Sequence, residues 1–93
     1  MKALDYENFT IATEQMIMLH FKEAEKMTEN GNLIVSAMNY HMATGVFNLW
    51  FQCIFLSEHS SPLAVIDNER LKKIMKDFAV LAFPVLTEIG VEL

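Results

Sequence analysis

The feature that most constrains this chain is a long stretch without charge. No Asp, Glu, Lys or Arg occurs between Glu29 and Glu58, a gap of twenty-eight residues. Placed on a helix at about 100° per residue, the segment from about Leu33 to Ser57 is apolar around nearly its whole circumference. A helix of this kind must be buried on most of its sides. The stretch therefore predicts a central helix against which the rest of the chain packs.

A second helix is predicted before this stretch, from about Asp5 to Glu29, with Asp5 as its N-cap. Its core side is predicted from residues at the spacing of one helix face: Phe9, Ala12, Met16, Leu19 and, less strongly, Glu23, with Ile17, Phe21 and Ala24 beside them. Asn30-Gly31-Asn32 ends this helix, because Gly and Asn accept the left-handed conformation of a C-terminal cap. So short a turn predicts that the two helices pack antiparallel as a hairpin.

A third, shorter helix is predicted after a loop at 57–62. Leu63 to Ile66 is read as a single helical turn led by Ser61 and Pro62, and Asp67 or Asn68 is expected to cap the helix itself. The predicted core face comprises Leu71, Ile74, Phe78, Leu81 and Val85, with Met75 and Ala82 beside it. Pro84 should end or kink the helix near Phe83, and the tail at 85–93 is left open between a kinked turn and an extended arm. The expected fold is all-α, with one helical domain over 1–93.

The apolar content of the chain predicts self-association. With 93 residues, of which 53% are hydrophobic, a single copy hides a limited share of its surface. Three helices of these lengths cover two flanks of the central helix and leave a third apolar flank in water, which is uncommon on soluble monomers. A homodimer that completes a helical bundle removes this patch. The residues expected at its core are Phe47, Trp50, Phe51 and Ile54.

The charge-free stretch is also long enough to cross a bilayer. Asn39, His41 and Asn48 lie within it, and no basic cluster flanks it, so a buried helix is favoured over a membrane span. The net charge of −5 disfavours contact with nucleic acid. The one cysteine, Cys53, cannot form an internal disulfide, and the first residues contain no apolar signal core. The cytoplasm is the expected compartment.

A polar stripe on the central helix is the most specific feature of the sequence. His41, Asn48 and Gln52 share one narrow sector with Gly45, and His59 extends it. It is interpreted as a solvent-facing edge or as a hydrogen-bond network that sets dimer register. The alternative is the lining of a ligand pocket, in which a histidine titrates near neutral pH.

No motif for catalysis is found, so no enzymatic activity and no cofactor are predicted. His20 and Glu23 are the only His–acid pair at metal-ligand spacing on a helix, which is too little for a metal site. The serines around Glu58 and His59 are adjacent in a loop, and they lack the nucleophile elbow of hydrolases. Capping and turn formation explain them better.

A basic cluster at the start of the third helix indicates a partner. Four of the seven basic residues fall within seven positions: Arg70, Lys72, Lys73 and Lys76. The overall negative charge makes an acidic protein a better partner than DNA, and the competing interpretation is a solvated helix face. The expected function is a small homodimeric helical module that regulates or adapts another protein. The alternative is a small-molecule sensor that uses the polar stripe.

Overall fold

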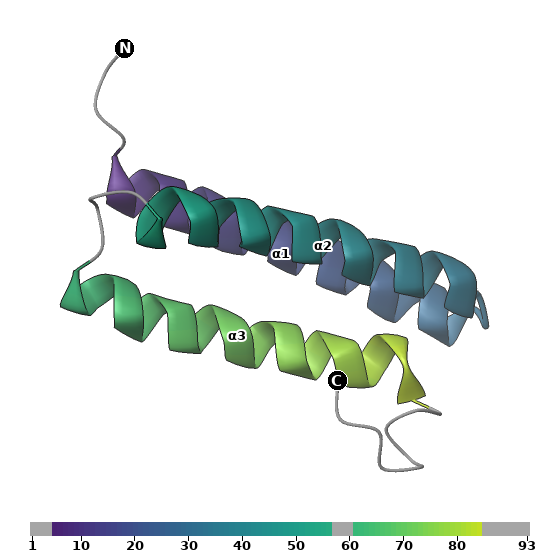
Figure 1. Ribbon diagram of the computed structural model, residues 1–93. Coiled ribbons are helices and arrows are strands. Elements are labelled where there is room, and N and C mark those ends of the chain that lie inside the picture. Colours follow the sequence, from purple (N-terminus) through teal and green to yellow (C-terminus); the bar gives the residue numbers. More distant parts are fainter. Residues whose placement is uncertain (1–4, 57–60, 85–93) are drawn as a thin grey trace.

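The computed structural model describes residues 5–56 and 61–84, which form three helices and no strand. Helix α1 spans Tyr6–Glu29, α2 spans Leu33–Phe55 and α3 spans Pro62–Ala82. Figure 1 shows α1 and α2 as an antiparallel pair, with α3 lying along one side of the pair and running in the same direction as α1. The predicted all-α, three-helix arrangement is confirmed for the described residues.

The hairpin is built by local caps, of which the sequence predicts the cap at Asp5 and the end of α1 at 30–32. The Asp5 carboxylate accepts from the backbone N–H of Asn8 at 3.2 Å and so caps α1. Gly31 closes the turn with φ of 77°, a conformation that costs little only at glycine. Asn32 then caps α2, its side chain accepting from Val35 N–H at 3.2 Å. The expected end of α1 and start of α2 are both confirmed.

The start of α3 differs from the sequence prediction. The helix begins at Pro62, with the Ser61 hydroxyl accepting from the Ala64 backbone N–H at 3.3 Å, and it continues through the two residues expected to cap it. Asp67 does not cap the helix because its carboxylate accepts hydrogen bonds from Tyr6 and Arg70. Asn68 is buried against the core. The predicted single turn at 63–66 is thus the first turn of α3. The predicted Val85 contact and the tail at 85–93 lie outside the described residues.

The core lies between the hairpin and α3. Its fully buried side chains include Trp50 and Ile54 of α2, Ile17 of α1, and Leu71 and Phe78 of α3. Aromatic rings of all three helices meet in the second half of α3. There Phe78 contacts Phe21 and Tyr40 edge to face, with ring centroids 5.0 and 5.4 Å apart. The predicted core face of the third helix is therefore confirmed at Leu71 and Phe78, while Ile74 and Leu81 are half-buried.

The core side of α1 is rotated from its predicted position. Thr10, Thr13, Ile17 and Ala24 are buried, whereas Ala12, Met16 and Leu19 are exposed. The shift arises because two threonines occupy core positions in which their hydroxyls are satisfied: Thr13 donates to the Phe9 carbonyl at 2.8 Å, and Thr10 accepts from Trp50. The apolar pattern is therefore right at Ile17 and Ala24, which are buried, and wrong at Ala12, Met16 and Leu19.

Polar side chains also join α1 to α2. His20 Nδ1 donates to the Asn39 amide oxygen at 2.9 Å, and Thr28 and Ser36 share a hydrogen bond of 2.9 Å. Asn39 and Ser36 are buried, so these bonds satisfy groups that would otherwise be costly to bury. In the part of the chain that the structure describes, no helix is long and apolar enough to cross a membrane.

Candidate interaction surfaces

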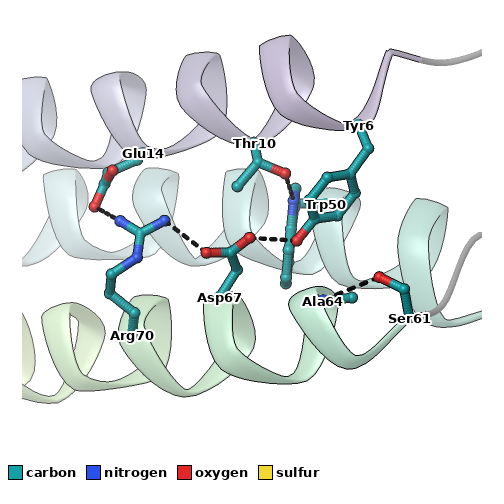
Figure 2. A network of polar contacts seen from close by, with 8 residues as sticks. All are labelled: Tyr6, Thr10, Glu14, Trp50, Ser61, Ala64, Asp67 and Arg70. Atoms are coloured by element: carbon teal, nitrogen blue, oxygen red, sulfur yellow. Dashed lines mark hydrogen bonds and ion pairs between the residues drawn. The ribbon is translucent and has the colours of Figure 1, made fainter.

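A polar network connects the N-terminal halves of α1 and α3 (Figure 2). The Tyr6 hydroxyl donates to one oxygen of Asp67, and the other oxygen accepts from Arg70 Nη2 at 3.1 Å. Arg70 Nη1 donates to the Glu14 carboxylate across the helix pair. One arginine thus bridges two acids, and one of these acids also holds a tyrosine. The network fixes the position of α3 along α1.

The network changes the proton affinities of two of its members. Burial raises the pKa of Tyr6 to about 12, and its hydrogen bond to the Asp67 carboxylate adds to the increase. The hydrogen bond to Glu14 raises the pKa of the Arg70 guanidinium. Both effects extend to higher pH the charge states that the two groups have at neutral pH, with the tyrosine neutral and the arginine charged.

A pocket of about 370 Å³ lies beside this network. It is lined by Tyr6, Glu7, Thr10, Ile11, Leu63, Asp67 and Arg70. Its arginine and Asp67 already satisfy each other, and Thr10 accepts a 2.9 Å hydrogen bond from Trp50 Nε1 behind it (Figure 2). A ligand would have to displace these internal bonds to gain its own, so the pocket is poorly suited to small-molecule recognition.

The predicted basic cluster divides into two parts. Arg70 is committed to Glu14 and Asp67. Lys72, Lys73 and Lys76 are exposed, and none of them makes an ion pair within residues 5–56 and 61–84. The cluster therefore offers three lysines to solvent, while its arginine stabilises the contact between helices.

The predicted polar stripe lies on the solvent side of α2. His41, Gly45, Asn48 and Gln52 are all exposed, and His59 lies outside the described residues. The His41 ring lies near Phe83 at the end of α3, with ring centroids 6.0 Å apart. Within one copy of the chain the stripe forms the edge of the helix, and the pocket described above lies elsewhere.

The single chain already buries two of the four residues expected at the dimer core. Trp50 and Ile54 have no exposed surface in the single chain, so they belong to its own core and are closed to a second copy. Phe47 and Phe51 are half-buried, and Phe47 packs on both Phe51 and Trp50. This burial arises because α3 covers this side of α2, which leaves the apolar excess of the hairpin on another side.

The largest apolar surface of the hairpin lies away from α3, and we call it the outer face. Tyr40 and Phe21 contact α3, and at about 100° per residue the outer-face residues lie roughly 140–200° around α1 and α2 from these two. The outer face comprises Met16 and Leu19 of α1 and Met38, Met42, Leu49 and Leu56 of α2, with exposed fractions from 45% to 77%.

The outer face on α1 is the very stripe that the sequence predicts as its core side. The 3-4 spacing of Ala12, Met16 and Leu19 predicts a surface to be covered, and no described residue of this chain covers it. The polar network of Tyr6 and Asp67 has no sequence signal, because its members are sixty-one positions apart.

Comparisons and metal chemistry add no further site. No group of three His, Cys, Asp or Glu side chains in the described ranges could hold a metal ion. Protein-family models, curated proteins and solved structures were compared with this chain, and none matches it. The outer face and the three exposed lysines of α3 are therefore the candidate interaction surfaces.

Proposed function

We propose that this chain is a homodimeric helical interaction module that binds another protein as a regulator or adaptor. The outer face joins two copies, and the lysines of α3 remain outward for the partner. The cytoplasm is the proposed compartment, since the single cysteine offers no internal disulfide.

The outer face is the observation that carries the proposal. Six large side chains, each exposing about half of its surface or more, present several hundred Å² of apolar area on one side of the hairpin. Patches of this size are unusual on monomers and mark sites of protein association. Joining two hairpins through this side produces a four-helix core, a stable arrangement for antiparallel helix pairs.

The partner side of the proposal rests on α3. Lys72, Lys73 and Lys76 lie on the helix that covers the opposite side of the hairpin, so dimerisation through the outer face leaves them accessible. Three unpaired ammonium groups favour a partner with an acidic surface, because complementary charge accelerates association.

Sedimentation equilibrium at micromolar concentration tests the proposal. We expect the mass of a dimer for the wild-type chain and the mass of a monomer for a variant that carries Met42→Lys and Leu49→Lys. The matched control raises the net charge by the same amount at two exposed positions of α3, Glu69→Gln and Asp77→Asn, and should remain dimeric. A compact, folded wild-type monomer at this concentration would contradict the proposal.

A further inference from the structure

We infer that the second copy packs antiparallel on α2 itself, with the two α2 helices crossing at Gly45 on a two-fold axis. This inference rests on the proposed function and specifies which residues of the outer face meet. It identifies the partner of the apolar stripe of α2 as the same stripe of a second chain, rather than a groove on an unrelated protein.

The spacing of apolar residues along α2 supports self-pairing. On the side of the outer face, six exposed or half-buried apolar residues fall at the same intervals in both directions from the Gly45–Val46 step: Val35, Met38 and Met42 before it, and Leu49, Cys53 and Leu56 after it. Ile34 and Val46 lie on the same side without an apolar counterpart. A stripe with the same spacing in both directions can pack antiparallel on an identical stripe, as a two-fold interface requires. A different partner would place no such condition on the intervals.

The internal register of the hairpin centres the α1 stripe at the same level. Trp50 bonds to Thr10, and Asn39 bonds to His20, so Met16 lies level with α2 positions one or two residues before Gly45. Met16 is one of the two α1 residues of the outer face, and the other, Leu19, lies less than one turn further along the helix. An axis at Gly45 therefore also passes close to the α1 part of the outer face, so the two helices can meet their copies at the same time.

Gly45 has no role within the single chain. A Cβ placed there would meet nothing within 4 Å, and its backbone needs no positive φ. Glycine in the middle of a helix is destabilising relative to alanine, so an exposed glycine at this position calls for a reason. Close approach of a second helix backbone at the crossing point provides that reason.

Charge and area also favour a second copy. Helix α2 contains no charged residue, so its stripe offers nothing by which a charged partner could be selected. The outer face presents several hundred Å² on each side, approaching the roughly 800 Å² that each partner contributes to a standard interface. The same apolar face of a second copy needs no charged group for recognition, and it matches the outer face in area.

The decisive experiment replaces Gly45 by leucine and measures the dimer dissociation constant by sedimentation velocity over a dilution series. The single chain has open space at this position and leucine is a good helix former, so the variant should fold. A side chain at the crossing point should weaken the dimer by at least about tenfold. The matched control is Asp77→Leu, an exposed position of α3 on the covered side of the hairpin, which should leave dimer affinity unchanged.

The outcomes separate the inference from the proposal beneath it. A monomeric wild type overturns both. If Met42→Lys with Leu49→Lys dissociates the dimer while Gly45→Leu does not, the outer face joins the copies but the helices do not cross at Gly45, and the inference alone is wrong. If neither variant dissociates the dimer, the copies meet through a different surface, and both the inference and the outer-face interface of the proposal are wrong. Circular dichroism of each variant verifies that it is folded.

Discussion

At the scale of single residues, the position of α3 depends on Tyr6 at the start of α1. Its hydroxyl donates to Asp67, which in turn accepts from Arg70. A phenol can donate this bond only while it keeps its proton. The hydrogen bond between Tyr6 and Asp67 therefore persists only while Tyr6 keeps its proton.

This dependence predicts a loss of stability at high pH. The pKa of Tyr6 is raised to about 12 by burial and by the Asp67 hydrogen bond, whereas an unfolded chain releases the proton near pH 10. Its contribution to stability is fully present below about pH 10 and is lost as the pH rises towards 12. Absorbance of the ionised phenol should show one of the two tyrosines titrating late. Tyr6→Phe should remove that late transition, and a Tyr6 that titrates near pH 10 would contradict the prediction.

Individual residues also mark the limit of what the sequence predicts. Burial of Trp50 follows from its place in a nearly charge-free helix, but its bond to Thr10 does not, because nothing in a sequence pairs residues forty positions apart. Thr10 and Thr13 are polar but buried, whereas Met16 and Leu19 are apolar but exposed. Hydrogen bonding inside the core, which hydrophobic periodicity ignores, decides these cases.

At the scale of elements, the helices are predicted well where local chemistry sets their ends. Asp5, Gly31 and Asn32 act through their immediate neighbours, so both ends of the turn follow from the sequence. The start of α3 is missed because Ser61 and Asp67 are both good N-caps and the choice between them is tertiary. Contact with Tyr6 and Arg70 occupies Asp67 and leaves Ser61 as the cap.

The cap of α3 can be tested directly. Ser61→Ala removes the side-chain acceptor for the Ala64 N–H and should lower the free energy of unfolding by about 1 kcal/mol. Ser61→Asp keeps an acceptor at the same place and should retain most of the stability. Chemical denaturation of the three proteins provides the comparison. If α3 began at Asp67 or Asn68 instead, both substitutions would leave stability unchanged.

At the scale of the whole molecule, the hairpin is the main body and α3 is an addition to one of its sides. Helices α1 and α2 contact each other far more extensively than either contacts α3. Helix α3 covers one side of the hairpin and exposes its own lysines to solvent. The other side of the hairpin is apolar and exposed. The sequence predicts the excess of apolar surface, but it does not predict which side is open, since that depends on where α3 docks.

The lysines of α3 yield a prediction about binding. Changing Lys72→Glu together with Lys73→Glu should slow association with an acidic protein partner by about tenfold at low salt, and it should leave the melting temperature unchanged. The control reverses two exposed lysines of α1, Lys22→Glu with Lys26→Glu, and alters net charge by the same amount. Surface plasmon resonance with a partner captured by the wild-type chain measures both rates. Equal slowing by the two variants would assign the effect to net charge and not to this surface.

The two ends of α3 are attached by different kinds of contact, and they should therefore respond differently to the solvent. The first half is held by charged and hydrogen-bonded groups, since Arg70 and Glu14 remain partly exposed to water. The last turns are held by aromatic rings, with Phe78 against Phe21 and Tyr40 against Phe83. Dissolved salt screens the first kind of contact, whereas cooling weakens the second. A saline solution would therefore loosen α3 from its beginning and a cold one from its end, so the same helix would fray in opposite directions under the two conditions.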